Sequence, residues 1–328
     1  MLCFNRQVLP LVKTTAGELF LGKCEEILKA RKKRLAGKVQ LILTSPPFPL
    51  KRKKRYGNFT GNAYIEWLSK LAPTFAELLT DDGSIVLELG NAWEPKQPVQ
   101  SLLPLKSLLA FVENKNANLK LCQEFICFNP ARLPSPAQWV TIERIRAKDS
   151  FTRLWWMAKT TKPAADNTRV LKEYSKAMKE LLARQDYNSG KRPSEHVISE
   201  KGFLQRYRGA IPPNVITDDA RLIPSDLLIG ANTGSSEAYQ MFCRDHGIVL
   251  HPARMPHFLA EFFIKFLTKP NDLVLDPFSG SNTVGWVAEK LGRRWASIEA
   301  REEYAIASVA RFDSCVATSL LPKRAVAA

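Results

Sequence analysis

The stretch from residue 272 to residue 299 constrains the fold more than any other part of the chain. An apolar run at 272–275 leads into a loop that contains Gly280. Apolar spacing then predicts a helix over 283–291 and a second strand over 295–298. A strand, a tight glycine turn, a helix and a strand in this order form a βαβ unit with parallel strands. We therefore expect an α/β sheet that has helices packed on its faces.

This βαβ unit also predicts a site for a nucleotide-like cofactor. Glycine lets the backbone approach a ligand closely, and the start of the following helix offers free N–H groups. Glu299 ends the second strand, where a carboxylate can accept both hydroxyl hydrogens of a ribose. Ser281, Asn282 and Thr283 would equally suit capping of the helix. The loop has neither the GxGxxG pattern nor a Walker lysine, which argues against NAD and ATP.

A second motif lies near the N-terminus, where the apolar run Val39–Thr44 stops at two prolines. The run predicts a buried strand, and prolines fix the backbone and remove two N–H donors, so nearby carbonyls can face a cleft as acceptors. Ser45 adds a hydroxyl, and Phe48 adds a flat apolar face on which a base could stack. A proline-terminated strand is ordinary by itself. Beside a cofactor loop it predicts a pocket for a base with an exocyclic amine, because strand ends build the sites of such folds.

The chemistry expected at this motif needs no nucleophilic side chain. A cytosine-C5 methylase needs a Pro-Cys step, and this sequence has none. Attack by an amine nitrogen on a sulfonium methyl group needs alignment, desolvation and a destination for a proton. Acceptors on both N–H bonds would make the nitrogen more nucleophilic, and we assign that role to Ser45 and the carbonyl of Pro46.

Helix and strand patterns alternate elsewhere, except in one long insert. We expect helices at 64–79, 102–111, 258–267 and 302–313, and strands at 84–89 and 121–128. From about residue 160 to residue 250, polar residues, glycine, proline and basic residues dominate and the periodicity fades. This stretch is therefore expected to be a separate, loop-rich insert.

Composition indicates a polyanionic partner. The 328 residues carry a net charge of +16 with a pI of about 9.6, and such an excess favours nucleic acid because neutralised phosphates release counterions. One basic run follows the expected base pocket directly, and we predict that it grips DNA phosphates. Its residues are Lys51, Arg52, Lys53, Lys54 and Arg55.

The remaining composition points to a cytoplasmic protein without a metal. The six cysteines are scattered, form no CxxC or zinc spacing, and are expected to be reduced thiols. No apolar run is long enough for a membrane span, and no signal peptide is evident. The four histidines have no acidic or cysteine partners at ligand spacing, so no metal is expected.

The order of these parts resembles the β-class N4-cytosine DNA methyltransferases, in which the catalytic half precedes the cofactor half. The similarity runs through most of the chain, and its segments are Arg52 to Asn58, Phe128-Asn129-Pro130, Leu133 to Pro136, Ile211 to Asn214, His251 to Arg254 and Gly280 to Thr283. One departure lies at Gly22-Lys23-Cys24, where many relatives have an acid after the glycine. The cofactor contact of that acid is therefore in question here.

The resemblance implies a Rossmann-like S-adenosylmethionine-dependent methyltransferase sheet in circularly permuted order. It implies four parts: a catalytic half (1–159), a target-recognition region (160–248), a cofactor-binding half (249–316) and a tail (317–328). It also implies the site residues. Ser45, Pro46, Pro47 and Phe48 would form the base pocket, and Asp276, Phe278, Gly280, Ser281, Asn282, Thr283 and Glu299 would bind the cofactor. Double-stranded DNA would be the substrate, and a restriction enzyme acting on the same site would be a partner.

Several alternatives stay open at this point. Serine at position 45 favours cytosine N4, whereas adenine-N6 enzymes more often have Asp or Asn there, so an adenine-N6 methyltransferase is the runner-up. An RNA methyltransferase is less favoured because no separate RNA-binding module is evident. A catalytically silent DNA-binding protein on the same scaffold is a further alternative, against which the intact Ser45, Gly280 and Glu299 argue.

Overall fold

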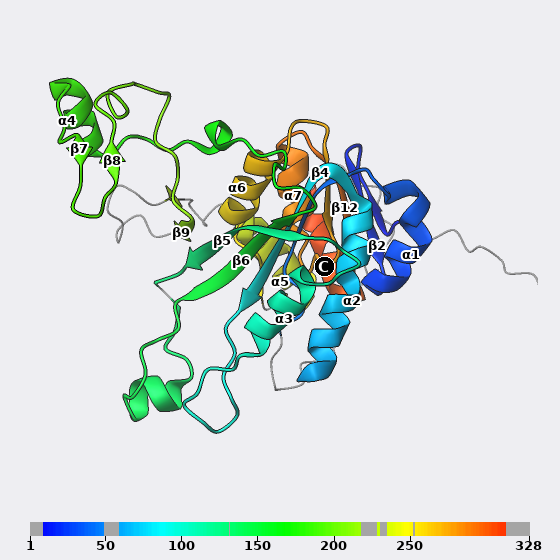
Figure 1. Cartoon of the computed structure of the whole chain (residues 1–328). Coiled ribbons are helices and arrows are strands. Elements are labelled where there is room, and N and C mark those ends of the chain that lie inside the picture. Colours follow the sequence, from blue (N-terminus) through cyan, green and yellow to red (C-terminus); the bar gives the residue numbers. More distant parts are fainter. Residues whose placement is uncertain are drawn as a thin grey trace, which may run out of the picture.

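A ten-stranded mixed sheet forms the centre of the molecule (Figure 1). The computed structural model describes residues 9–48, 59–130, 132–217, 228–229, 235–251 and 253–312. The strand order is β1-β2-β12-β11-β3-β4-β6-β5-β9-β10. The strands are β1 (Val12–Lys13), β2 (Gly17–Leu21), β3 (Val39–Thr44), β4 (Leu79–Gly90), β5 (Lys120–Phe128), β6 (Phe151–Ala158), β9 (Val215–Thr217), β10 (Leu228–Ile229), β11 (Leu273–Asp276) and β12 (Arg294–Glu299).

The centre of this sheet joins the two ends of the sequence. Strands β2, β12, β11, β3 and β4 are parallel to one another, whereas β1 pairs antiparallel with β2 and β6 runs antiparallel between β4 and β5. β3 pairs with β11, which comes more than two hundred residues later in the chain, and all six residues of β3 are buried. The α/β sheet and the permuted order of its halves, both predicted from the sequence, are confirmed.

Helices cover both faces of the sheet. One face packs against α1 (Cys24–Leu35), α2 (Asn62–Leu78) and α3 (Leu103–Val112). The other face packs against α6 (His257–Leu267), α7 (Thr283–Lys290) and α8 (Glu302–Ala307), which a 3-10 turn, η3 (Ser308–Arg311), extends. Leu41 and Leu43 of β3 pack on the second face, whereas Ile42 packs on the first, as the alternation of a strand requires. The expected helices and strands are thus present, with ends that shift by a few residues.

The N-terminal segment joins the sheet beside β12. β2 pairs in parallel with β12 from Gly17 to Leu21, and α1 follows it. The predicted division assigns these residues to the catalytic half (1–159). In the sheet, β1 and β2 lie on the same side of β3 as β11 and β12. Pairing between strands that are far apart in the sequence decides this position, so sequence order does not reveal it.

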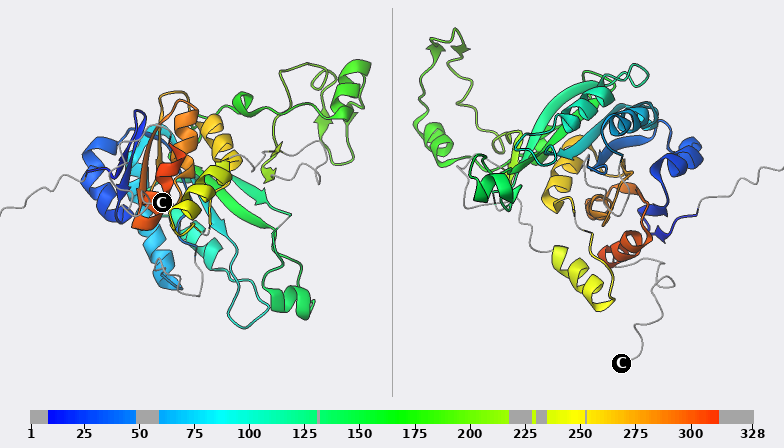
Figure 2. Two further views of the ribbon diagram at one scale, coloured as in Figure 1. Left: turned by 180° about the vertical axis from the view of Figure 1, so that it is seen from behind. Right: turned by 90° about the horizontal axis from the view of Figure 1, so that it is seen from below.

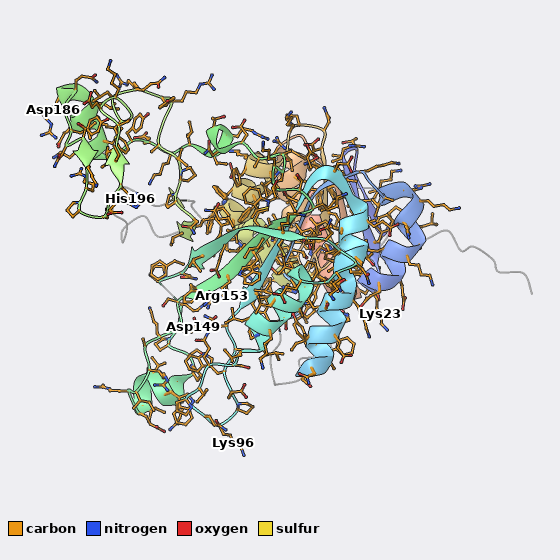
Figure 3. The ribbon with its side chains drawn as sticks, in the orientation of Figure 1. Lys23, Lys96, Asp149, Arg153, Asp186 and His196 are labelled. Atoms are coloured by element: carbon orange, nitrogen blue, oxygen red, sulfur yellow. The ribbon has the colours of Figure 1, made fainter. Side chains whose placement is uncertain are left out.

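Two segments project from the sheet on its β5 side (Figure 1). Residues 129–150 connect β5 to β6 and include a π-helical turn, η1 (Gln138–Ile142). A lobe with α4 (Lys176–Arg184), β7 (Gly190–Lys191) and β8 (Val197–Ile198) lies within the expected insert. Figure 3 shows Asp186 and His196 on this lobe, and Lys23 on the opposite side of the molecule beside α1.

The expected insert is only partly separate from the sheet. β9 adds to the sheet beside β5. Another 3-10 turn, η2 (Asn167–Val170), packs against α6, and α5 (Ser235–Asp245) packs against α8 and η3 (Figure 2). The boundaries at residues 160 and 248 therefore remain a prediction. In the described part of the chain, no helix has both the length and the apolar character that a membrane crossing requires.

Candidate active site

A cavity of about 880 Å³ opens where several parallel strands end. Its wall includes the residues after β2, β3, β11 and β12, and it also includes side chains from β4 and β6. The carboxyl ends of parallel strands are where such sheets bind ligands. The cavity brings together the two motifs predicted from the sequence, since Ser45 to Phe48 and Phe278 to Gly280 line the same space.

One corner of the cavity, the cofactor corner, is formed by Asp276 to Thr283 with Glu299. Gly280 adopts a positive φ of 52°, and its N–H donates to Glu299 Oε2 at 2.7 Å. The Arg301 N–H donates to Glu299 Oε1 at 2.8 Å. Burial raises the pKa of Glu299 despite these two backbone hydrogen bonds. The Glu299 carboxylate is thereby fixed at the cavity wall.

Glycine at position 280 is required by space as well as by conformation. A Cβ atom built on Gly280 would lie 2.9 Å from Nε2 of His251, which also lines the cavity. A contact that close forces one of the two groups to move. The loop therefore approaches the wall of the cavity with no room for a side chain, as expected of a loop that cradles a ligand.

Asp276 links the cofactor corner to β3. Its Oδ1 accepts from Thr44 Oγ1 at 2.6 Å and from the Phe278 N–H at 3.1 Å. Burial raises the pKa of Asp276 to about 7. Thr44 directly precedes Ser45, so this hydrogen bond ties the cofactor loop to the strand that ends at the predicted base pocket.

Asn282 differs from the other predicted cofactor residues. Its side chain is fully buried and does not line the cavity, and its Oδ1 accepts from Ser297 Oγ of β12 at 2.7 Å. It occupies the N-cap position of α7 without a side-chain capping bond. Asn282 therefore holds the loop on the sheet. Ser281 and Thr283, its two neighbours, do line the cavity.

The opposite corner, the base corner, contains a short chain of hydrogen bonds. The Ser45 hydroxyl donates to Glu88 Oε2 at 2.6 Å, and the Thr152 hydroxyl donates to Glu88 Oε1 at 2.8 Å. Glu88 is only 7% exposed. Since the hydroxyl hydrogen of Ser45 is engaged with this carboxylate, its lone pairs remain available to a donor in the cavity.

Sequence reasoning missed Glu88, although a signal was present. It lies in β4 between Leu87 and Leu89, in a run that is otherwise apolar and buried. A charged residue inside such a strand has a high cost unless it is paired or functional. Because Glu88 lies near the carboxyl end of a parallel strand, its position indicated a candidate site residue.

Phe48 lines the cavity at the base corner, and Gly90 gives it room. A Cβ atom on Gly90 would come within 2.7 Å of the Phe48 ring. The basic run that follows in the sequence, Lys51 to Arg55, lies outside the described residues.

Sequence reasoning also missed an aromatic wall beside the cofactor loop. Trp67 of α2 packs on Phe278 with ring centroids 5.6 Å apart, and on Phe59 at 5.7 Å. Trp67 Nε1 donates to Glu25 Oε1 at 2.6 Å. Burial by itself would raise the pKa of Glu25. Hydrogen bonds to its carboxylate, of which the bond from Trp67 has the largest effect, outweigh burial and lower this pKa. An acid thus does line the cavity here, two positions after Lys23.

The segment between β5 and β6 contributes to the wall of the cavity. Asn129 and Arg132 of this segment line the cavity. Asp149 Oδ2 lies 3.7 Å from Arg132 Nη1, and Asp149 Oδ1 accepts a hydrogen bond from Asn91 Nδ2 at 2.8 Å. Figure 3 shows Asp149 and Arg153 at the base of this segment. Among the described residues, no cluster of three or more His, Cys, Asp or Glu side chains could hold a metal ion.

Comparison with known proteins agrees with this geometry. Residues 39–309 match the family model described as DNA methylase. The type II methyltransferase M.PvuII of Proteus hauseri is 39% identical over 314 residues, which are 95% of this chain and 88% of that protein. The type II methyltransferase M2.DpnII of Streptococcus pneumoniae is 50% identical over 54 residues, 16% of this chain and 20% of that protein.

Solved structures give the same result. The PvuII DNA methyltransferase, described as cytosine-N4-specific, superposes with a TM-score of 0.70 at 33% identity, covering 93% of this chain and 89% of that one. The complex of M1.HpyAVI with S-adenosylmethionine superposes with a TM-score of 0.50 at 17% identity, covering 91% and 100%. The second likeness is evidence for the fold alone.

Proposed function

Because the chain belongs to the DNA methylase family, we propose that it transfers a methyl group from S-adenosylmethionine to N4 of a cytosine in double-stranded DNA. The observation that supports this most is the Ser45–Glu88 pair. A hydroxyl held by a buried carboxylate faces the cofactor loop across one cavity, and it offers lone pairs where an exocyclic amine needs them. The full-length similarity to a cytosine-N4-specific enzyme favours cytosine over adenine.

The cofactor corner fits S-adenosylmethionine. Each oxygen of Glu299 accepts one backbone N–H and retains a lone pair, so the carboxylate can accept both ribose hydroxyls. Gly280 and the start of α7 offer a close backbone approach, and Phe278 and Trp67 offer an apolar wall. When bound, the cofactor supplies an electrophilic methyl group on a sulfonium sulfur.

The base corner would prepare the amine of a cytosine that has been flipped out of the duplex. Phe48 stacks on the base, while Ser45 Oγ and the carbonyl of Pro46 each accept one amine hydrogen. These two acceptors draw the nitrogen lone pair out of conjugation with the ring and toward the cofactor. Pro46 and Pro47 hold the acceptors in place because their rings fix the backbone.

Glu88 gives the proton of the amine a destination. Ser45 Oγ receives that proton while its own hydroxyl hydrogen passes to Glu88 Oε2, 2.6 Å away. The Thr152 hydroxyl, 2.8 Å from Glu88 Oε1, keeps the carboxylate oriented. Glu88 therefore acts through Ser45 as a positioning residue and proton acceptor.

Other parts of the chain would bind the DNA. The net charge of +16 and the run Lys51 to Arg55 favour contacts with phosphates beside the flipped nucleotide. Residues 160–248 would choose the target sequence, because their lobe projects beyond the sheet and leaves the cavity residues to do the chemistry (Figure 1). Exchanging 160–248 for the segment of a relative should move the modified site and keep N4-methylcytosine. A changed product atom would contradict this division.

The biological role we propose is protection of host DNA in the cytoplasm from a restriction enzyme that cuts the same site. The long similarity to a type II methyltransferase supports it. DNA from a host that expresses the chain should resist that enzyme, and DNA from a host with Ser45→Ala should be cut.

The direct test of the reaction is mass spectrometry of nucleosides after incubation of duplex DNA with methyl-labelled cofactor. The proposal predicts label in N4-methylcytosine. Label in N6-methyladenine would assign the chain to the adenine-N6 enzymes. Label in 5-methylcytosine, or no transfer by a folded protein that binds DNA, would refute the mechanism.

A further inference from the structure

Arg311 is a buried cation at the wall of the cavity. It ends η3, and its side chain is 8% exposed. Its Nε donates to the Ser281 carbonyl at 2.6 Å, and its Nη2 donates to Ser281 Oγ at 3.2 Å. Arg311 thus reaches the cofactor loop from an element that follows β12, and it lines the same cavity as Ser281.

No acid balances this charge in the described part of the chain. Burial lowers the pKa of Arg311 to about 10, and the charges of Tyr239, Arg254 and Cys243 are the next causes of its shift. None of these is a carboxylic acid. A buried guanidinium has five N–H donors and a high desolvation cost, so two bonds to a neutral serine leave it incompletely compensated.

A second guanidinium lies on the same wall. The guanidinium carbon of Arg311 lies 4.7 Å from the centre of the Tyr239 ring, and that of Arg254 lies 5.7 Å from the centre of the same ring. Both arginines line the cavity. Arg254 Nη2 lies 2.9 Å from the side-chain oxygen of Gln240, another neutral partner, when that amide is oriented toward it. His251, whose ring packs on Tyr304 at 4.5 Å, completes this wall beside Gly280.

The carboxylates Glu299 and Glu88, which line the same cavity, are engaged by other groups. Glu299 is engaged by the N–H groups of Gly280 and Arg301, and Glu88 is engaged by Ser45 and Thr152. Two like charges that share one aromatic ring, with no acid between them, are stabilised when an anion binds. The cavity is therefore polarised, with a cationic wall at Ser281.

We infer that Arg311, assisted by Arg254, binds the α-carboxylate of S-adenosylmethionine and so orients the methionine end of the cofactor over Ser281. This inference rests on the proposed cofactor. Arginine suits a carboxylate because its planar fork can donate two parallel hydrogen bonds. Its anchorage to Ser281 fixes the fork before the cofactor enters.

Calorimetry with a matched ligand pair tests this inference on the full chain. One ligand is S-adenosylhomocysteine, and the other is its analogue with hydrogen in place of the α-carboxylate. The wild type should bind the carboxylate-bearing ligand about 10–100-fold more tightly. Arg311→Gln should abolish most of that ratio while its affinity for the decarboxylated analogue stays close to that of the wild type.

Two further variants serve as controls. Arg311→Lys, which keeps the charge but not the fork, should retain part of the ratio. Arg244→Gln should retain all of it, because Arg244 is exposed in the last turn of α5 and does not line the cavity. If Arg311→Gln fails to fold, Arg254→Gln measures the same ratio and should reduce it.

Four results would overturn the inference. If Arg311→Gln weakened the binding of both ligands equally, Arg311 would only support the structure of the loop. If the wild type bound both ligands with equal affinity, a contact between the protein and the α-carboxylate would be excluded. Loss of affinity for duplex DNA with an unchanged ligand ratio would assign Arg311 to a phosphate. A wild type that binds neither ligand would refute the proposed cofactor as well.

Discussion

The cofactor corner and the base corner of the cavity differ in how their polar groups are held. At the cofactor corner, Asp276 and Glu299 are buried acids that accept backbone N–H groups, and both have raised pKa values. At the base corner, Ser45 is half-buried and depends on the side chains of Glu88 and Thr152. A ligand pocket built on the backbone is rigid, whereas a relay of side chains can move a proton. The difference predicts that one corner determines affinity and the other determines rate.

The largest effect is expected at the base corner. Ser45→Ala removes the acceptor for the amine and the path to Glu88, so the single-turnover rate should fall by about 10²–10³-fold, by analogy with the loss of one oriented hydrogen-bond partner. Calorimetry should find the affinity for S-adenosylmethionine unchanged. Ser45→Thr keeps a hydroxyl and should recover part of the rate. An equal loss in both variants would exclude the hydroxyl as the cause.

The next effect is expected at the cofactor corner. Glu299→Ala removes two ribose hydrogen bonds to a charged acceptor and should weaken binding of S-adenosylmethionine by about 2–4 kcal/mol. Titration calorimetry measures it. Glu302→Ala is the matched control, since Glu302 is exposed in the first turn of α8. Unchanged affinity in a folded Glu299→Ala variant would refute the assignment.

Phe48 sharpens the comparison from the DNA side. Phe48→Ala should weaken capture of the flipped base by roughly 1–3 kcal/mol, because it removes the stacking face. Fluorescence of a base analogue at the target position reports the flipped population directly. Phe48→Tyr retains a flat ring and should behave like the wild type. A loss of cofactor affinity in Phe48→Ala would show that the two corners are not separate.

The smallest effect concerns the pH dependence of stability. The pKa of Asp276 is raised to about 7 in the fold, so between pH 4 and pH 7 the native state binds more protons than the unfolded state and stability falls as pH rises. From pH 6 to pH 7 the loss should be about 1 kcal/mol at most. Urea unfolding of Asp276→Asn, which can still accept from Thr44, should lose this slope. A steeper slope in the variant would contradict the assigned cause.

The two corners also differ in what the sequence alone could predict. Ser45 directly follows β3, Glu299 ends β12 and Gly280 lies in the loop after β11, so local pattern placed all three correctly near strand ends. Glu88 and Arg311 act through contacts with residues far along the chain, at Ser45 and Ser281. Such pairings depend on strand order and helix packing, which a single sequence does not reveal.

The N-terminal segment and Asn282 illustrate the same limit. Hydrogen bonding across the sheet places β2 beside β12, although the two lie at opposite ends of the sequence. Asn282 stands in the predicted loop with a left-handed backbone, but its side chain bonds Ser297 of the sheet. Local spacing identifies the loop, and only the fold decides which of its side chains face the cavity.

The most direct test of the separation between the two corners is the single-turnover rate of methyl transfer at saturating S-adenosylmethionine. If Glu299 contributes only binding, Glu299→Ala should return to within about threefold of the wild-type rate, while Ser45→Ala should remain at least 10²-fold slower. If Glu299→Ala stays as slow as Ser45→Ala when the cofactor saturates, the division of the cavity into a binding corner and a chemical corner is wrong.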